Sequence, residues 1–157
     1  MSVIIRRALV EDAKAVAELS MKLVIQHQEY DPNRFTRIAD FEGMEWFYGG
    51  QTKAKDAAVI VAELDSKIVG FAFVQYEPKN YANLLESAAW LHDIYVNESV
   101  RGHNVGKSLI EASGTAAEEL GADKLMLTVA VKNQFARDFF EKAGFRSTMV
   151  EMMLGLD

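Results

Sequence analysis

The pattern of apolar and polar positions along the chain predicts a series of strands before any single residue type is considered. Short runs rich in branched and aromatic residues, bounded by polar or turn-forming residues, are typical of strands. These runs cover residues 3–8, 57–64, 67–76 and 88–96. Asp65-Ser66 separates the second and third runs, so these two strands are expected to form a hairpin. Residues 77–85, which include Pro78 and Asn80, are polar and predict a loop.

Two helices are predicted between the first and second strands. Val16, Leu19 and Leu23 recur at helical spacing. Acidic residues at 11–12 favour the start of this helix, and Asp31-Pro32 sets its end. A second helix is predicted from 40 to about 48, closed by the glycine pair at 49–50.

The last third of the chain alternates helix and strand. Five residues fall on one face of a helix that Gly121 ends: Val105, Leu109, Ala112, Ala116 and Leu120. Residues 124–131 are almost continuously apolar, which predicts a strand buried on both faces. Asn133 is expected to cap a helix that ends at Gly144, and residues 145–154 are predicted to form a last strand.

This order predicts a mixed α/β (α+β) fold with a mostly antiparallel central sheet flanked by helices. A strand-helix-strand crossover is expected near its end. Residues 1–157 contain no internal repeat and no linker rich in serine or glycine, so we expect one domain over this whole range.

Composition narrows the class of protein. Half of the 157 residues are hydrophobic, which is enough for a full core, and no apolar run approaches the roughly 20 residues that span a bilayer. The first residues lack the order of a signal peptide, and there is no cysteine. We therefore expect a cytoplasmic protein without a membrane partner. The formal net charge of -6 argues against nucleic-acid binding. It suits a cationic substrate, although solubility explains the same charge.

The segment from Arg101 to Ser108 contains the clearest chemical signal. It lies between a predicted strand and a predicted helix, where free backbone amides and the helix dipole attract a phosphate. Gly102 and Gly106 allow close approach of backbone, while Arg101 and Lys107 add positive charge. A nucleoside-triphosphate P-loop needs four residues between its glycines, and here there are three. An ordinary strand-to-helix turn remains an alternative on the loop alone.

Two stretches together resemble the GCN5-related N-acetyltransferase (GNAT) family. The loop is similar to the family's pattern Gln/Arg-x-x-Gly-x-Gly/Ala, with Arg101 and Gly106 at its first and last positions and Asn104 where the middle glycine is usual. Asparagine adopts left-handed backbone angles more readily than most residues. Residues 133–145, Asn-Gln-Phe-Ala-Arg-Asp-Phe-Phe-Glu-Lys-Ala-Gly-Phe, resemble the family's second motif. The resemblance implies the family's acyl-CoA N-acyltransferase fold.

The resemblance also implies acetyl-CoA as cosubstrate and no metal. The residues expected to bind the cofactor come from the strand end, the loop and the second motif. They are Ile94, Tyr95, Val96, Arg101, Gly102, His103, Asn104, Val105, Gly106, Lys107, Ser108, Asn133 and Phe140. The family's splayed strand would place residues 94–96 along the pantetheine arm, with an amide near Val96 polarising the thioester carbonyl.

Proton transfer is expected from residues on the same strand. An attacking amine must be neutral, although a free alkylamine is mostly protonated at neutral pH. His92 and Asp93 are the candidate general bases, since a proton must be taken up directly or through water. Adjacent strand residues point to opposite faces unless a bulge intervenes, so only one of the two is expected to act directly. Phe140 stands where the family has a tyrosine acid, so Tyr95, Tyr76 or another tyrosine substitutes, or the thiolate leaves unassisted.

The acceptor is expected to be a primary amine of a small molecule. The resemblance points to aromatic residues and an arginine in the helices and hairpins as substrate contacts: Tyr30, Arg34, Phe35, Trp46, Phe47, Tyr48, Tyr76, Tyr81 and Trp90. Core or hinge packing is favoured for Trp46 and Phe47. Acidic residues between 29 and 45 suggest a polyamine-like cation, although an amphipathic helix surface explains the same charges. A protein lysine or N-terminus stays open as the acceptor. The alternative function is a CoA-binding sensor or interaction module with little transferase activity. A homodimer is also left open.

Overall fold

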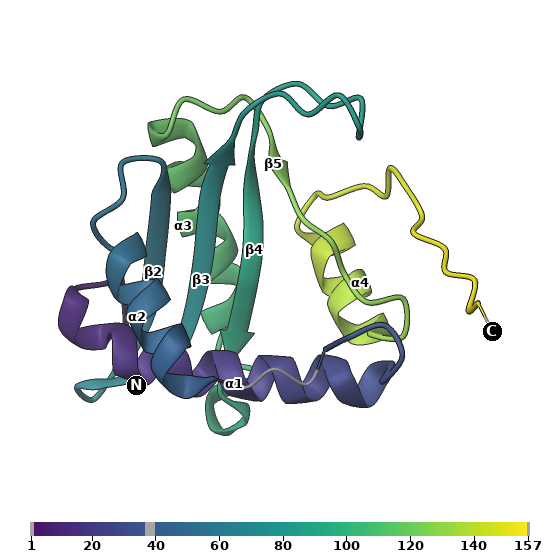
Figure 1. Ribbon diagram of the computed structural model, residues 1–157. Helices are drawn as coiled ribbons and strands as arrows, with labels where there is room; N and C mark the ends of the chain where they lie inside the picture. Colours follow the sequence, from purple (N-terminus) through teal and green to yellow (C-terminus); the bar gives the residue numbers. More distant parts are fainter. Residues whose placement is uncertain (1, 37–39, 157) are drawn as a thin grey trace.

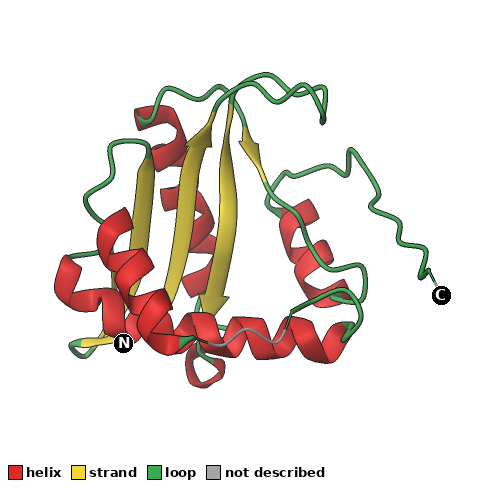
Figure 2. Cartoon of the chain, viewed as in Figure 1, coloured by secondary structure: helices red, strands yellow, loops and turns green. Residues whose placement is uncertain are grey.

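The computed structural model describes residues 2–36 and 40–156 as a curved sheet with helices on both faces (Figures 1 and 2). The sheet has five strands in the order β1-β2-β3-β4-β5. The strands are β1 (Val3–Arg7), β2 (Ala57–Leu64), β3 (Lys67–Glu77), β4 (Ala88–Val96) and β5 (Leu125–Met126). The helices are η1 (Val10–Asp12), α1 (Ala13–Tyr30), α2 (Phe41–Gln51), η2 (Glu98–Val100), α3 (Val105–Glu119) and α4 (Gln134–Lys142).

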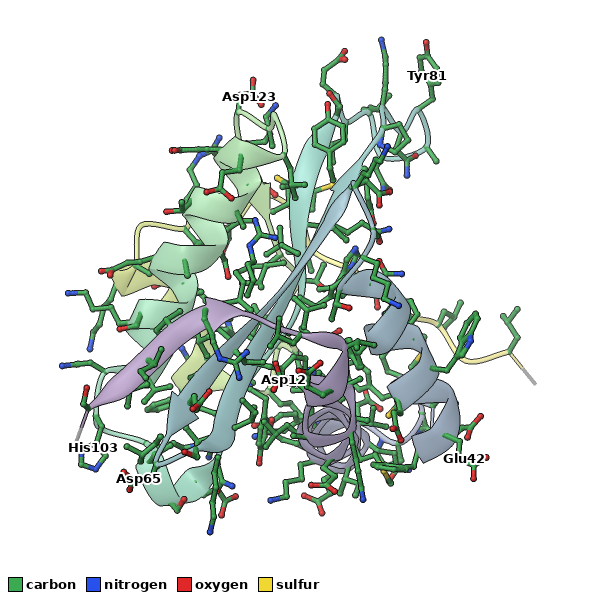
Figure 3. All side chains as sticks on the ribbon, turned by 90° about the vertical axis from the view of Figure 1, so that its left-hand side faces the viewer. Asp12, Glu42, Asp65, Tyr81, His103 and Asp123 are labelled. Carbon is green, nitrogen blue, oxygen red and sulfur yellow. The ribbon has the colours of Figure 1, made fainter. Side chains whose placement is uncertain are left out.

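Strands β1 to β4 are antiparallel neighbours, and β5 runs parallel to β4. The mixed, mostly antiparallel sheet expected from the sequence is therefore confirmed. The β2–β3 hairpin turns through Asp65 and Ser66, whose φ values of 50° and 62° are both left-handed. Two such residues form the tight turn whose twist matches that of the paired strands. Figure 3 shows Asp65 at this end of the sheet.

The core has two parts, one on each face of the sheet. Helices α1 and α2 cover one face, where Val16, Tyr48 and Phe71 are almost fully buried. Helix α3 covers the other face with Val105 and Leu109, and it lies behind the sheet in Figure 1. Strand β2 is buried on both faces, as its continuous apolar run indicates.

Three sequence predictions are wrong at the level of elements. The glycine pair Gly49-Gly50 does not close α2, which continues to Gln51. Residues 124–131 form a strand only over Leu125–Met126, and the flanking residues are half-buried or exposed. Residues 145–154 form no strand and run as an extended segment away from the sheet (Figure 1). Among the described residues, no strand pairs with 127–131 or with 145–154.

Candidate active site

A cleft opens where β4 and β5 separate. The two strands pair only through Ala89 with Leu125 and Trp90 with Met126, and then they diverge (Figure 1). The cleft has a volume of about 300 Å3 and lies between the end of β4, the start of α3 and helix α4. It is lined by Gln26, Ile94, Tyr95, Val96, Val100, Arg101, Gly102, Asn104, Val105, Gly106, Lys107, Asn133, Phe135, Ala136, Phe139 and Phe140. Nearly all the residues predicted to bind a cofactor thus share one cleft.

The loop before α3 has the backbone of an anion-binding turn. Gly102 has a φ of 87°, and Asn104, the N-cap of α3, has a φ of 61° and a ψ of 14°. The left-handed conformation expected of Asn104 is therefore present. Asp40 and Asn133 cap α2 and α4 through bonds of 3.1 Å to the amides of Gly43 and Ala136. In the described part of the chain, no side chain caps α3 in this way. Its first amides are left for a ligand.

The charged residues of the loop lie at the rim of the cleft. The Arg101 Nε donates a 3.1 Å hydrogen bond to the carbonyl of Val96, and its guanidinium lies 5.4 Å from the centre of the Tyr95 ring. Lys107 is exposed, with its Nζ 3.9 Å from Glu111. Such an exposed pair is weak, so this lysine is available to an anion.

Two predicted cofactor residues lie outside the lining of the cleft. His103 is exposed, and Figure 3 shows it at the periphery of the molecule. Ser108 is half-buried within α3, where its amide donates to the carbonyl of Asn104 at 3.0 Å. All the other residues predicted to bind the cofactor line the cleft.

Gly106 lies close to a side chain of α4, which leaves little room for a Cβ. A Cβ added there would lie 3.2 Å from Cζ of Phe139, closer than ordinary van der Waals contact. The Phe139 ring comes from α4 and lines the same cleft. The close contact therefore joins the N-terminus of α3 to α4 across the cleft.

Asn133 and Phe140 form part of the far wall. Asn133 uses its Oδ1 to cap α4, which leaves its Nδ2 group as a donor for a ligand. Phe140 is only 8% exposed and meets Phe139 and Phe145 edge-to-face, with ring centres 5.6 and 5.8 Å apart. Its ring is an apolar wall without a proton to donate.

A β-bulge at His92 changes the direction of the candidate bases. Phe73 pairs with Asp93 and the next residue, Val74, pairs with Leu91, so His92 has no partner on β3. His92 stacks on Phe73 at 5.9 Å, and Asp93 bonds to Tyr48, so both side chains lie on the face covered by α1 and α2. The bulge removes the expected alternation between these neighbours.

Asp93 lies in a short chain of hydrogen bonds. The Tyr48 hydroxyl donates to Oδ2 of Asp93 at 2.8 Å and lies 3.0 Å from the Ser20 hydroxyl. Because the tyrosine has one proton, Ser20 is the donor in the second bond. Burial raises the pKa of Asp93 above its ordinary value, while the bond from Tyr48 and the nearby His92 and His27 act to lower it. Burial and the neighbouring Asp93 raise the pKa of Tyr48.

His92 is the more exposed of the two candidate bases. Its side chain is 38% exposed, and its Nε2 lies 2.6 Å from Oε1 of Glu77. It also stacks on Trp90, with ring centres 6.2 Å apart. The carboxylate of Glu77 already bonds to this nitrogen. In Asp93, the bond from Tyr48 occupies only Oδ2, so Oδ1 is left to accept a proton.

Tyr95 is the tyrosine that borders the cleft. It is 8% exposed and lies among the lining residues, beside Arg101. Tyr76 pairs with Ala89, near the opposite end of β4. Of the two tyrosines named from the sequence as substitutes for the missing acid, only Tyr95 therefore reaches the cleft.

Comparison with known proteins identifies the family. Residues 21–145 match the acetyltransferase (GNAT) family. The chain belongs to the acetyltransferase (GNAT) family. The resemblance stated from the two motifs is confirmed.

Relatives and solved structures agree with this assignment. The chain is 33% identical over 88 residues to an uncharacterised N-acetyltransferase, YycN, of Bacillus subtilis, a match that covers 56% of this chain and 54% of the relative. It is 31% identical over 111 residues to an N-alpha-acetyltransferase of Sulfurisphaera tokodaii, covering 67% of this chain and 66% of that protein. The match thus spans about half of the first relative's length and two thirds of the second's.

The fold of a GNAT enzyme is also found in the solved structures. An aminoglycoside N-acetyltransferase, AAC(6')-Iy, crystallised in complex with CoA, superposes with a TM-score of 0.77 at 17% identity, over 99% of this chain and 95% of that one. The predicted GNAT-like fold is therefore confirmed.

Two expectations for the aromatic residues of α2 need correction. Core or hinge packing was expected of Trp46 and Phe47. Trp46 is 82% exposed, and Phe47 is 39% exposed although its ring packs on Tyr48 and Phe73. Helix α2 turns Tyr48 inward instead, where it is 4% exposed. The sequence did not distinguish the three adjacent aromatic residues because helix rotation depends on packing against the sheet.

The other predicted substrate contacts are spread over the molecule. Tyr81 is 77% exposed on the loop between β3 and β4, far from Glu42 of α2 in Figure 3. Arg34 pairs with Glu151 and lies 5.0 Å over the Phe35 ring. Tyr30 meets His27 edge-to-face at 6.0 Å. These residues do not form one pocket.

Part of the acidic character near the α1–α2 connection has a local structural role. Asp40 caps α2, and Asp31 accepts a 3.1 Å bond from the amide of Asn33. Glu29 lines a second hollow of about 360 Å3 with Lys22, Ile25, Gln26, Tyr95, Asn97 and Glu98. This hollow shares Gln26 and Tyr95 with the cleft. Two carboxylates and one lysine therefore lie beside the cleft wall.

Ser20 and Gln26 are the site residues that sequence reasoning missed. Both lie on α1, where Ser20 is 4% exposed and supports Tyr48, and Gln26 lines the cleft. A serine on the otherwise apolar face of α1 was the available signal, since a buried hydroxyl needs a partner.

Two further observations concern the described residues alone. Within residues 2–36 and 40–156, no three His, Asp or Glu side chains are grouped so that they could hold a metal ion. In the same part of the chain, no helix has the length and apolar character to cross a membrane.

Proposed function

We propose that this GNAT-family protein transfers the acetyl group of acetyl-CoA to a primary amine of a small molecule. Two features carry the proposal. One is a cleft with an uncapped helix N-terminus, and the other is the half-buried carboxylate of Asp93, which precedes the lining residue Ile94 in the sequence. The first feature suits a pyrophosphate, and the second suits a general base.

The residues of the cleft fit coenzyme A in two separate ways. The amides of Val105, Gly106 and Lys107, together with the charges of Arg101 and Lys107, suit the pyrophosphate. The apolar wall of Ile94, Val96 and Phe139 suits the pantetheine arm, with the Nδ2 group of Asn133 as a donor. When bound, acetyl-CoA supplies the thioester carbon that the amine attacks.

Asp93 is the proposed general base. A carboxylate whose pKa is raised holds a proton more strongly than an ordinary aspartate, which brings it closer to the basicity needed at neutral pH. The bond from Tyr48 occupies Oδ2, which leaves Oδ1 to accept a proton from the amine, directly or through water. His92 is the second choice, because Glu77 already occupies its Nε2.

Tyr95 is the proposed source of the proton for the departing thiolate. It is buried at the edge of the cleft, on the strand that also positions Asp93. Phe140 occupies the position expected of a tyrosine acid and cannot donate a proton. An amide near Val96 remains the proposed donor to the thioester oxygen.

A cationic amine is the proposed acceptor class. Glu29 and Glu98 border the second hollow beside Tyr95, and the net charge of the chain is -6. An acidic surface attracts cations to the site. The test uses a panel of three amine classes. Polyamines are chosen for the acidic hollow, aminoglycosides for the substrate named by a structural neighbour, and peptides with a free N-terminus for the N-alpha-acetyltransferase relative.

The test combines calorimetry with acetyl-CoA and a thiol-release assay over that panel. Binding of acetyl-CoA and turnover on a small amine support the proposal. Turnover confined to peptides shifts the acceptor class to protein N-termini. Tight binding without turnover on any amine supports the alternative, a CoA-binding sensor or interaction module, which Phe140 favours because it lacks an acidic proton. Absence of binding contradicts both functions.

A further inference from the structure

A half-buried histidine, His27, lies on the face of α1 that is turned toward Asp93. Ser20, Leu23 and His27 are three and four residues apart, so they share one face of the helix. Ser20 on this face contacts Tyr48, which in turn holds Asp93. His27 follows two turns later, roughly 10 Å along the helix axis. Burial raises the pKa of Asp93, and the charge of His27 is among the effects that lower it, so the two side chains lie within range of a direct charge interaction.

Three contacts hold the imidazole ring of His27 in one orientation. Its Nδ1 lies 2.8 Å from the carbonyl oxygen of Leu23, one turn earlier in α1. Tyr30 meets the ring edge-to-face at 6.0 Å, and Phe35 does so at 5.0 Å. The neighbouring Gln26 lines the cleft, and this end of α1 extends past β4 toward α4 in Figure 1. The ring is therefore fixed in place beside the proposed site.

The bond to Leu23 determines which nitrogen carries the proton in neutral His27. A carbonyl oxygen only accepts hydrogen bonds, so the Nδ1 of His27 must be the donor. A neutral imidazole has a single N–H, and its other nitrogen then carries a lone pair. Among the described residues, no hydrogen bond engages the Nε2 of His27. This nitrogen is thus an acceptor for a proton at the far end of the ring.

Acetyl transfer to an amine releases one proton into solution. The acceptor arrives as R-NH3+, because a free alkylamine is mostly protonated at neutral pH. The C–N bond forms and the C–S bond breaks, with the electron pair of the C–S bond going to sulfur. Of the three hydrogens on nitrogen, one stays in the amide, one ends on the thiol of coenzyme A, and one is released. The released proton is first taken by the base, Asp93, and must leave it before the next turnover.

The hydrogen-bond chain behind Asp93 offers this proton no route to solvent. The chain runs from Asp93 to Tyr48 and ends at Ser20, and both hydroxyl residues are almost fully buried. Ser20 donates to Tyr48 and Tyr48 donates to Asp93, so both hydroxyl protons already point toward the carboxylate. The proton must therefore leave from the side of Oδ1.

We propose that the Nε2 of His27 receives this proton from Asp93 through water and releases it to solvent. The inference rests on the acetyl transfer proposed above. His92 is the other histidine near Asp93, but Glu77 lies 2.6 Å from its Nε2 and so occupies the far end of that ring. The titratable and charged side chains on the elements around His27 are Tyr30 and Asp31 on α1, Arg34 in the α1–α2 connection, Tyr48 on α2, and His92 and Asp93 on β4.

Chemical rescue tests this route. His27→Ala removes the imidazole and leaves space for a small buffer molecule. At low buffer concentration, we expect kcat to fall by roughly 10²-fold with KM unchanged, for the amine of the panel that the unmodified protein acetylates fastest. Added imidazole should restore kcat in proportion to its neutral form, since only that form accepts a proton. Thiol released without the amine is subtracted at each imidazole concentration, because imidazole itself attacks thioesters.

Two variants control for altered packing. His27→Phe fills the same space without a proton acceptor, so it should lose kcat as His27→Ala does and gain nothing from imidazole. Glu18→Ala, on the exposed face of α1, should keep the kcat of the unmodified protein. Recovery of His27→Phe by imidazole, or a loss in His27→Ala that imidazole does not repair, overturns the proposal.

The outcome also separates this route from the reaction itself. If His27→Ala keeps its kcat in an active enzyme, the route is wrong and acetyl transfer stands. If imidazole rescues His92→Ala while His27→Ala is unaffected, the route runs through His92 and the proposal is overturned. If the unmodified protein acetylates no amine of the panel, acetyl transfer is contradicted, and the route with it.

NMR spectroscopy tests the tautomer without any acceptor. The chain has three histidines, so the imidazole nitrogen signals can be assigned by single substitutions. In alkaline solution, where imidazole rings are neutral, we expect the proton of His27 on Nδ1 and a lone pair on Nε2. A proton on Nε2 overturns the proposal, because that nitrogen could not then accept another.

Discussion

The Tyr48 hydroxyl donates a 2.8 Å hydrogen bond to Oδ2 of Asp93, which joins helix α2 to the strand that borders the cleft. Behind it, the Ser20 hydroxyl of α1 lies 3.0 Å from the same tyrosine oxygen. The bulge at His92 is what turns Asp93 toward these two helices. Three elements distant in sequence therefore fix the orientation of one carboxylate.

Asp93→Asn should remove the general base and keep the shape of the site. Loss of a positioned base typically costs roughly 10²–10⁴-fold in rate. We expect a loss in kcat/KM for the amine within that range, with unchanged affinity for acetyl-CoA by calorimetry. His92→Asn is the matched control on the same bulge and should cost much less. A larger loss for His92→Asn than for Asp93→Asn would transfer the role to the histidine.

Tyr48→Phe should move the pH profile of the reaction. The bond from Tyr48 lowers the pKa of Asp93, so its removal should raise that pKa further. The base acts only when deprotonated, and the acid side of the kcat/KM profile should therefore shift to higher pH. Ser20→Ala, which leaves the Tyr48–Asp93 bond in place, should shift it less. If the pH profile of Tyr48→Phe is unchanged, Asp93 does not take part in the rate-determining proton transfer.

Tyr95→Phe tests the proposed acid. The substitution keeps the aromatic ring beside Arg101 and removes the hydroxyl. We expect kcat to fall by roughly 10²-fold, with little change in the affinity for acetyl-CoA. Tyr76→Phe, on a strand pair at the other end of β4, should leave kcat unchanged. Equal rates for Tyr95→Phe and the unmodified enzyme would mean that the thiolate leaves without this tyrosine.

Much of the fold could be predicted because its signals are local. The bounds of β2 and β4 follow from apolar runs between turn residues, and the left-handed Asn104 follows from its own side chain and its place before α3. The bulge at His92 could not be predicted, because it depends on the register between β3 and β4. The inward turn of Tyr48 also depends on how α2 packs on the sheet.

The errors at the end of the chain have a related cause. The sequences of 124–131 and 145–154 have strand patterns, but a pattern does not identify the partner strand. In this chain, only Leu125 and Met126 find one. Strand pairing is a property of two segments, so an apolar pattern in one segment does not show whether a second segment lies beside it.

Two aspartates should change the free energy of unfolding in opposite directions as pH rises. The first is Asp93. The pKa of folded Asp93 is raised above the ordinary value of 3.8, so between these two values the folded state binds more protons than the unfolded state. Its contribution to the free energy of unfolding therefore falls as pH rises through this window. At pH 7, Asp93→Asn should raise the free energy of unfolding in denaturant titrations. The exposed Glu118→Gln is the control, and a destabilised Asp93→Asn would contradict the assignment of burial as the main cause.

Asp12 should act in the reverse direction. The Arg6 guanidinium and the Leu9 amide, both 2.7 Å from Oδ2 of Asp12, hold the pKa of this carboxyl below 3.8. The unfolded state then binds more protons below that value, so stability is lost as pH falls from 3.8 through the folded pKa. Asp12→Asn should lower the free energy of unfolding at pH 7 and weaken its dependence on pH below 4. If the free energy of unfolding of Asp12→Asn depends on pH below 4 as it does in the unmodified protein, Asp12 is not one of the groups that cause this dependence.

Asn104 provides a matched pair of substitutions for the phosphate-binding loop. Its φ of 61° suits glycine at no cost, whereas a left-handed branched residue is strained by roughly 1–2 kcal/mol, equivalent to about 5- to 30-fold in an equilibrium constant. Asn104→Gly should therefore keep or improve the affinity for acetyl-CoA in calorimetry, and Asn104→Val should weaken it by a factor in that range. Both variants lose the amide side chain, so equal weakening in the two would show that the side chain, and not the backbone conformation, binds the ligand. Thermal unfolding of both variants separates a change in the loop from a loss of the fold.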